Sequence, residues 1–204
     1  MKKFKILSLV VVSTLVFASQ TASAMVNFGV KGGLGVSLDR TDAVTGSIPS
    51  YGYMGGVSAD FGMGPIGVEA DVFYVANKTR IGADSDNYGE VAMNSILVPV
   101  MAKFSLLGVM WISGGGYWNY GFGDVTSTIV SAGTEVLNIA VPLSDTIYAA
   151  SSFGAIGGVG VGIPLGMMKL VAEGRVRYGF TDLDTSSTTS VKTMAVDLLV
   201  GLVF

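Results

Sequence analysis

The feature that most constrains this chain is a strict alternation of apolar side chains at its carboxyl end. In VDLLVGLVF, residues 196–204, every second residue from Val196 to Phe204 is large and apolar, whereas the intervening positions include Asp197 and Gly201. Successive side chains of a β-strand lie on opposite faces, so this segment presents one hydrocarbon face and one mixed face. Such a strand needs an apolar environment on one side and small or polar neighbours on the other.

Period-two alternation recurs in eight segments of the chain. They are residues 26–38, 51–61, 66–76, 94–104, 109–122, 152–163, 168–180 and 193–204. Two charge-free stretches, 105–123 and 151–168, have the hydropathy of a membrane helix. Both are rich in glycine, which costs a helix interior about 1 kcal/mol relative to alanine, and their spacing favours strands. In the sixth segment one face is almost entirely glycine, which leaves room for the long side chains of Arg175 and Arg177 in the seventh.

The connections between the segments alternate in length. Three are four-residue turns, at 62–65, 105–108 and 164–167, and four are long polar links, at 39–50, 77–93, 123–151 and 181–192. Short periplasmic turns and long extracellular loops are typical of transmembrane barrels. Strands survive in hydrocarbon only when closure satisfies every backbone polar group. The sequence therefore predicts an all-β fold, an eight-stranded antiparallel up-and-down transmembrane β-barrel.

Aromatic residues gather at both ends of the predicted strands. The short-turn end has Phe28, Phe61, Phe104 and Phe204; the long-loop end has Tyr51, Tyr53, Tyr74, Tyr120, Phe122, Phe153, Tyr178 and Phe180. Two aromatic girdles mark the membrane–water interfaces of such barrels. We expect these residues to anchor the barrel in the bilayer.

Residues 1–24 have the pattern of a secretory signal peptide. Three early lysines precede an apolar run at 6–17, and Ala22-Ser23-Ala24 forms a small-residue cleavage site. The run is short for a bilayer-spanning helix, so a membrane anchor is the weaker alternative. We expect the barrel domain to occupy residues 25–204.

Composition narrows the class of partner. Hydrophobic residues make up 50% of the chain and charged residues only 13%, against about 25% charged in soluble domains. Without the three early lysines, nine basic residues face 15 acidic ones. Nucleic-acid binding needs clustered cations, so we expect no nucleic-acid partner.

Four stretches carry a family resemblance: FGVKGGLGVS (28–37), ILVPVMAKF (96–104), EGRVRYGFTDL (173–183) and LLVGLVF (198–204). With them the chain resembles the small bacterial outer-membrane β-barrel proteins, the eight-stranded OmpA-type and porin-family domains. The resemblance implies an outer-membrane location, contact with outer-membrane lipid and lipopolysaccharide, and recognition of the strand ending at Phe204 by the barrel-insertion machinery. The family includes porins, adhesins, anchors and a few enzymes, so the fold does not give the function.

Charged residues fall on the inward faces of the predicted strands. They are Lys31, Asp60, Glu69, Asp71, Lys103, Lys169, Glu173, Arg175, Arg177 and Asp197. Buried charges require partners, so we expect a salt-bridge network in the lumen, with an ion pathway or gate as the alternative. Arg175 and Asp197 lie at similar depth on neighbouring strands, and we expect them to pair.

The residues offer little support for catalysis. The chain has no histidine, the usual general base near neutral pH, and no cysteine nucleophile. A Ser–Lys dyad or the carboxylates Glu69 and Asp71 remain possible, but paired lumen carboxylates are more often salt-bridged. DSDN at 84–87 lacks the spacing of a calcium site. We expect no catalytic residue, no cofactor and no metal.

The connection 123–151 contains strand-like sequence of its own. TSTIV and EVLNIAVPL flank SAGT, and the apolar residues are Ile129, Val130, Val136, Leu137, Ile139 and Val141. We expect the fifth and sixth strands to continue above the membrane as a protruding hairpin. It either offers an edge to a protein partner or folds over its own barrel mouth.

The sequence leaves three functions open. A structural or surface-interaction role through the extracellular loops is the first. A narrow passive pore for ions or small solutes is the second, and a lipid-modifying enzyme is the third.

Overall fold

The computed structural model describes residues 25–41, 50–81, 88–106, 108–131, 134–143, 151–181 and 191–204. The predicted signal peptide and the DSDN motif lie outside the described residues. The described strands are β1 (Met25–Thr41), β2 (Ser50–Met63), β3 (Ile66–Ile81), β4 (Tyr88–Leu106), β5 (Met110–Ser131), β6 (Thr134–Pro142), β7 (Ser151–Leu165), β8 (Met168–Gly179) and β9 (Val191–Val203). Within these ranges, no helix is long and apolar enough to cross a membrane.

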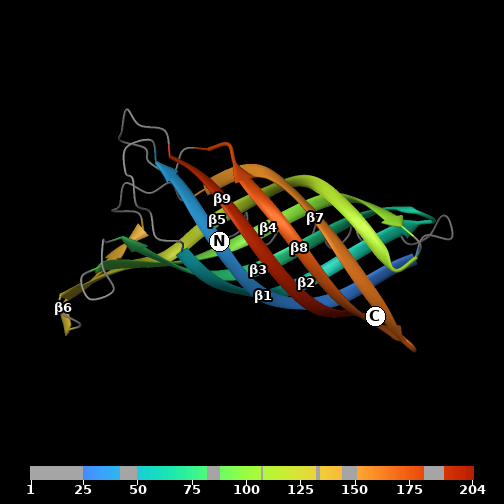
Figure 1. Cartoon of the computed structure of the whole chain (residues 1–204), viewed down its shortest axis with the longest axis horizontal. Helices are drawn as coiled ribbons and strands as arrows, with labels where there is room; N and C mark the ends of the chain where they lie inside the picture. The colour runs from blue at the N-terminus through green and yellow to red at the C-terminus, as the bar shows by residue number, and fades with distance from the viewer. Residues whose placement is uncertain are drawn as a thin grey trace, which may run out of the picture.

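The strands close into a barrel. All pairings are antiparallel, the order is β4-β3-β2-β1-β9-β8-β7-β5-β6, and β4 also pairs with β5. At the seam between β1 and β9, the amide of Phe204 donates to the carbonyl of Phe28 at 2.7 Å. Among the described strands β6 pairs with β5 alone and stands outside the ring, as Figure 1 shows. The prediction of a closed eight-stranded antiparallel barrel is confirmed.

The strands run further at the long-loop end than the sequence predicts. β3 reaches Ile81 instead of 76, and β4 begins at Tyr88 instead of 94, with Ile81 paired to Gly89. Beyond the hydrocarbon layer a strand no longer needs an apolar face, whereas its backbone still needs partners. Alternation therefore ends before pairing does.

The short turns at the other end depend on glycine. Gly64, Gly108 and Gly166 have φ values of 64°, 73° and 70°. Glycine adopts this left-handed region at little cost, which allows each chain reversal within a few residues. The short-turn end is therefore compact.

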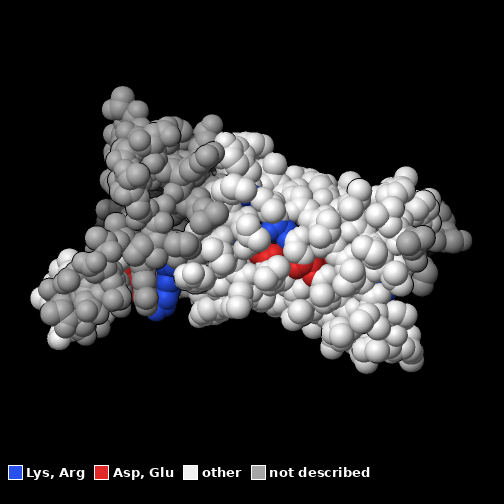
Figure 2. All heavy atoms as spheres, in the orientation of Figure 1, with Lys and Arg blue, Asp and Glu red and all other residues white. Residues whose placement is uncertain are grey.

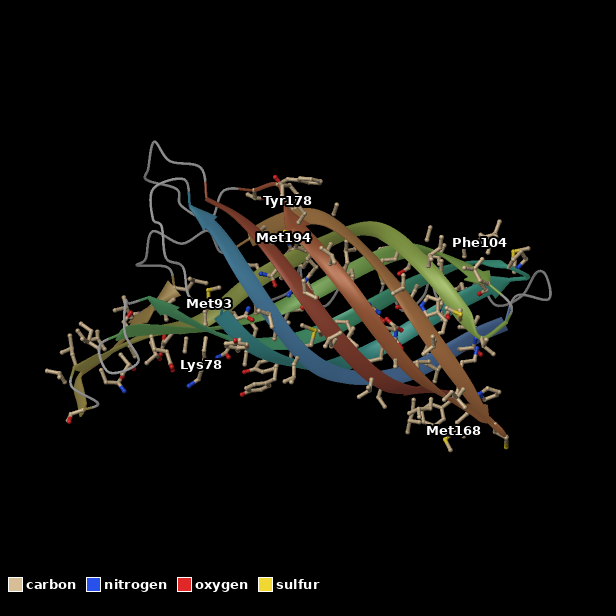
Figure 3. All side chains as sticks on the ribbon, viewed as in Figure 1. Lys78, Met93, Phe104, Met168, Tyr178 and Met194 are labelled. Atoms are coloured by element: carbon tan, nitrogen blue, oxygen red, sulfur yellow. The ribbon has the colours of Figure 1, made fainter. Side chains whose placement is uncertain are left out.

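Alternation separates two environments. Lipid-facing side chains such as Leu34 and Leu198 are two-thirds exposed at 67% and 66%, whereas Phe73 and Leu97 inside the barrel are buried at 0% and 1%. Figure 3 shows side chains on both surfaces of the wall, with Phe104 and Met168 near one end and Tyr178 and Met194 towards the other.

The glycine face of β7 fits large side chains from its neighbours. A Cβ on Gly160 would lie 2.3 Å from the Trp111 ring, and a Cβ on Gly158 would lie 3.0 Å from Arg175 Cγ. The expected space for Arg175 is present. The closest side-chain contact on this face is nevertheless made by Trp111 of β5.

Candidate functional site

A charged network fills the middle of the barrel. Lys31 of β1 lies at its centre, and its Nζ donates to Glu69 of β3 at 2.8 Å and to Glu173 of β8 at 2.7 Å. Asp71 Oδ1 lies 3.6 Å from the same nitrogen. Each of these residues occupies a position of its strand whose side chain points into the barrel. The pairing register of the strands alone therefore brings charges from three strands to the same depth in the lumen.

Arg175 joins the two sides of this network. Its guanidinium donates to Asp71 at 2.7 Å, to Glu69 at 2.6 Å and, through Nε, to Glu173 at 2.8 Å. The planar guanidinium carries five N–H donors and can bind several carboxylates at once. A lysine ammonium can also do so, but it fixes the positions of its partners less strictly. Arg175 therefore links β3 and β8 through hydrogen bonds across the lumen.

Lys103 extends the network towards the short-turn end. Its Nζ donates to Asp60 at 2.5 Å and to Glu69 at 3.0 Å, and lies 4.3 Å from the centroid of the Trp111 ring. Asp60 and Glu69 are direct cross-strand partners on β2 and β3. Like charges at such positions repel, and the shared lysine compensates them.

Arg177 and Asp197 form a separate bidentate pair on β8 and β9. Arg177 Nε lies 2.6 Å from Asp197 Oδ2, and its terminal nitrogen lies 2.9 Å from Oδ1. The expected pairing of Asp197 with Arg175 is wrong, although their backbones are directly opposite each other. The side chain of Arg175 reaches across the lumen to the acidic cluster, and Arg177 reaches Asp197 diagonally.

Burial makes this network obligatory. Lys31, Glu69, Asp71 and Arg175 expose 5%, 2%, 1% and 2% of their surfaces. Buried ions are tolerated only when partners compensate the loss of water. Three cations, Lys31, Lys103 and Arg175, face four carboxylates, and Asp71 Oδ1 accepts no hydrogen bond. The outermost predicted charge, Lys169, is exposed at the start of β8 and lies outside this cluster.

An apolar layer lies next to the network on its long-loop side. Phe73 follows Asp71 on the inner face of β3, and the Arg175 guanidinium carbon lies 5.7 Å from its ring centroid. The layer belongs to a buried apolar cluster of Met54, Phe73, Val75, Leu97, Met101, Tyr117, Ile156 and Leu199. Two of its members, Met101 and Leu199, pair in register with Glu69 and Glu173 and so lie beside the network itself. The lumen of the described barrel is thus packed with side chains at two successive levels.

Two inward aromatics were not assigned by the sequence reasoning. Trp111 and Tyr117 are buried at 5% and 7%, and Tyr117 lies beneath the Arg177 guanidinium at 5.9 Å. Both share the parity of Ser113, a polar residue of the fifth segment. Their spacing from Ser113 could have identified both rings as inward-facing. The many glycines of this segment obscured its alternation of apolar and polar residues.

The predicted interface aromatics lie at the two ends of the outer wall. At the short-turn end Phe28, Phe104 and Phe204 are exposed and Phe61 is half-buried; at the other end Tyr51, Tyr53, Tyr74, Tyr120, Phe153, Tyr178 and Phe180 are exposed, and Phe122 is half-buried. Rings pair between Tyr74 and Phe122 at 6.1 Å and between Tyr178 and Phe180 at 5.9 Å. Their role as membrane anchors remains a proposal.

Beyond the barrel, β5 and β6 form an outer hairpin, defined as residues 124–142. It begins after Gly123, which has a φ of 80°, beside a register shift between Ala92 and Asn94 of β4. The expected continuation of the fifth strand is present. The returning strand, β6, is separate from β7, which begins at Ser151. Figure 1 shows β6 extending away from the end of the barrel.

The two faces of the outer hairpin differ. Register places Val125 opposite Val141 and Ile129 opposite Leu137 on one face, whereas Thr126 faces Ala140 on the other. On the apolar face, Ile129, Leu137 and Ile139 expose 48%, 44% and 45% of their surfaces, and Val125 at the base is buried. This exposure disfavours the alternative in which these side chains pack into the barrel mouth.

Comparison with known proteins identifies the family. Residues 17–185 match the family described as "Outer membrane protein beta-barrel domain". The structure of Neisserial surface protein A is similar at 12% identity, covering 85% of this chain and 95% of that one with a TM-score of 0.45. That of Ail, the attachment invasion locus protein of Yersinia pestis, is similar at 13% identity, 87% and 98% coverage and a TM-score of 0.48. No curated protein sequence matches significantly. The chain belongs to the outer membrane protein β-barrel domain family and is a bacterial outer-membrane protein.

Proposed function

We propose that the protein is a non-conducting membrane anchor that carries an interaction surface on the outside of the cell. The observation that supports this most directly is the burial of the charged network across the middle of the barrel. Lys31, Glu69, Asp71 and Arg175 are each at most 5% exposed, so very little of their surface can contact water. The part of the protein that remains free to meet other molecules is therefore its extracellular side.

The passive-pore alternative has less support. Ions need a continuous water path, and here they would have to displace the charged network and then the apolar layer around Phe73 and Leu97, both nearly fully buried. Moving Arg175 alone would break its contacts with Asp71, Glu69 and Glu173 together. Breaking a buried pair by removing one partner costs about 3–5 kcal/mol, so opening is unfavourable.

Burial also argues against an enzymatic role at the carboxylates. Glu69 and Asp71 expose 2% and 1% of their surfaces, out of reach of a lipid or a soluble substrate. Lys31 and Arg175 contact both of them. Carboxylates neutralised in this way are structural members of a network and not a general acid–base pair.

The outer hairpin is the proposed contact surface. Its apolar face lies outside the membrane, in water, where exposed hydrocarbon is unfavourable until something covers it. β6 stands at the end of the sheet, and strand edges and apolar strand faces are recurrent sites of peptide and protein binding. A protein partner is therefore the occupant that we propose.

The test compares bacteria that display the protein with bacteria that display a hairpin variant. We expect the wild type to increase retention of the cells on a host-cell monolayer or on one another. We expect the triple variant Ile129→Ser/Leu137→Ser/Ile139→Ser to lose most of that gain, because it removes the exposed apolar face and leaves the barrel intact.

The control changes the opposite face of the same hairpin. Thr126→Ala/Thr128→Ala keeps the strand pairing and should retain wild-type adherence, with folding of each variant in the outer membrane verified by gel mobility before and after boiling. Equal adherence of the triple variant and the wild type would refute the assignment of contact to the apolar face.

A further inference from the structure

The turns at the short-turn end contain no charged residue. Their sequences are GMGPI at 62–66, SLLGVM at 105–110 and PLGMM at 164–168. Turn positions that meet water are usually filled by Gly, Pro, Asn, Asp or Ser. Here glycine supplies the left-handed position of each turn, and most of the remaining positions carry methionine, leucine, valine or isoleucine. This composition does not fit turns that project into an aqueous compartment.

Strand pairing places an outward apolar pair directly before each turn. These last pairs are Met63 with Ile66, Leu106 with Met110, and Leu165 with Met168. All six side chains are exposed, and each has the parity of the lipid-facing residues further along its strand. We call these six residues, with the 97% exposed Met167 at the tip of the third turn, the short-turn rim. The lipid-facing wall therefore continues into the rim.

Charged side chains at the short-turn end belong to the inner face of the barrel. Asp60, Lys103 and Lys169 have inward parity, and a Cβ on the inward Gly162 would lie 2.6 Å from Lys169 Cδ. The outer face differs at the long-loop end, where it reaches the charged Lys78, labelled in Figure 3. In Figure 2 the surface at the short-turn end, on the right of the view, is largely white over the described residues. The outer face thus becomes charged at one end only of the wall that these residues describe.

The thickness of the membrane places the rim at the boundary of the hydrocarbon. Tyr120 of β5 and Tyr178 of β8 are aromatic residues of the long-loop end, and each lies ten residues from the rim residue of its strand, Met110 or Met168. Ten residues of a strand tilted by about 40° span about 25 Å along the barrel axis. The apolar band of outer-membrane barrels is also about 25 Å tall. With these tyrosines at the outer interface, no polar strand end separates the rim from the inner leaflet.

We propose that the short-turn rim is immersed in the inner leaflet of the outer membrane and contacts the acyl chains of its phospholipids. Two observations favour lipid over a periplasmic protein as the occupant: the rim continues a wall that already contacts lipid, and one apolar band height reaches it. Methionine suits this surface, since its flexible thioether side chain adapts to a fluid neighbour. The rim lies at the end opposite to the outer hairpin, so the proposal does not rest on the proposed contact function.

The experiment measures whether the rim meets lipid or water. The chain has no cysteine, so Met63→Cys and Met167→Cys, made separately, each carry a single thiol for a nitroxide label. Each variant is refolded into vesicles of phosphatidylethanolamine and phosphatidylglycerol, with folding verified by gel mobility before and after boiling. Oxygen, which concentrates in lipid, and a water-soluble nickel chelate then compete to relax the label. We expect both rim labels to respond more to oxygen than to nickel, as a label on Leu198→Cys of the lipid-facing wall should.

The matched control is Val136→Cys in the outer hairpin, an exposed apolar position outside the membrane, whose label should respond more to nickel. A second readout needs no label. A charged thiol reagent on both sides of the bilayer should modify Met167→Cys about tenfold or more slowly than Val136→Cys, because apolar surroundings disfavour the reactive thiolate. Nickel responses and modification rates at both rim positions equal to those at Val136→Cys would overturn the proposal. They would place the rim in water, where a periplasmic protein could bind it.

Discussion

At the scale of single residues, the barrel interior is organised by reach and not only by register. Arg175 and Asp197 are backbone partners, yet Arg175 contacts Asp71, Glu69 and Glu173, while Arg177 contacts Asp197. The lumen is only a few side chains wide, so a long side chain can reach across it. An inward charge can therefore pair either with a residue on the neighbouring strand or with one on the opposite wall. The densest acidic cluster attracts the arginine that lies level with it.

This arrangement predicts the response to Asp197→Ala. The substitution leaves Arg177 without the carboxylate that binds it and should destabilise the folded barrel by about 3–5 kcal/mol. The measurement is urea unfolding in lipid vesicles, together with a double-mutant cycle. Asp197→Ala should couple strongly to Arg177→Met and combine additively with Arg175→Met. Strong coupling to Arg175→Met would restore the pairing that the structure contradicts.

At the scale of strands, much of the fold could be predicted from the sequence. The eight wall strands follow from alternation, because the lipid-facing residue of each rung must be apolar. The long-loop ends of β3 and β4 could not be predicted, since outside the hydrocarbon the pattern lapses while hydrogen bonding continues. β6 was recognised as strand-like, but its separation from β7, which begins at Ser151, could not be predicted.

The candidate site was predictable to the same degree. Parity alone brings Lys31, Glu69, Asp71, Glu173 and Arg175 to the interior, because each is a charge on a face opposite a hydrocarbon one. Parity cannot tell which cation reaches which carboxylate across the lumen. It also missed Trp111, whose place depends on the absence of a side chain at Gly160 of the neighbouring strand.

The fit between β5 and β7 gives a prediction at this scale. Gly160→Ala would bring a Cβ to 2.3 Å from the Trp111 ring, closer than the ring can tolerate without shifting. Overpacking of this kind costs about 1–3 kcal/mol, measurable by the same urea unfolding. Trp111→Leu in the same chain should recover part of the loss.

A matched control for that prediction lies on the next strand. A Cβ on Gly174 of β8, on the lipid-facing side, would meet its nearest neighbour at 3.8 Å, an ordinary contact. Gly174→Ala should therefore be close to neutral. If Gly160→Ala were equally neutral, the close packing of Trp111 on β7 would be refuted.

At the scale of the whole molecule, the protein separates three environments along one ring of strands. Lipid hydrocarbon contacts the outer wall, and a charged network and an apolar layer fill the interior. The strands that extend beyond the membrane reach water. The interior charges hold opposite walls together, since Lys31 and Arg175 each contact both β3 and β8. A barrel braced in this way gives a rigid base for the outer hairpin and has no need of an open lumen.

The most direct test of that account is single-channel conductance of the folded protein in a planar lipid bilayer. Folding would be verified beforehand by the compact gel mobility that is lost on boiling. The account predicts a silent barrel, with no discrete current steps at moderate voltage. Stable, reproducible conductance steps from the folded wild type would show a continuous water path through the network and would contradict it.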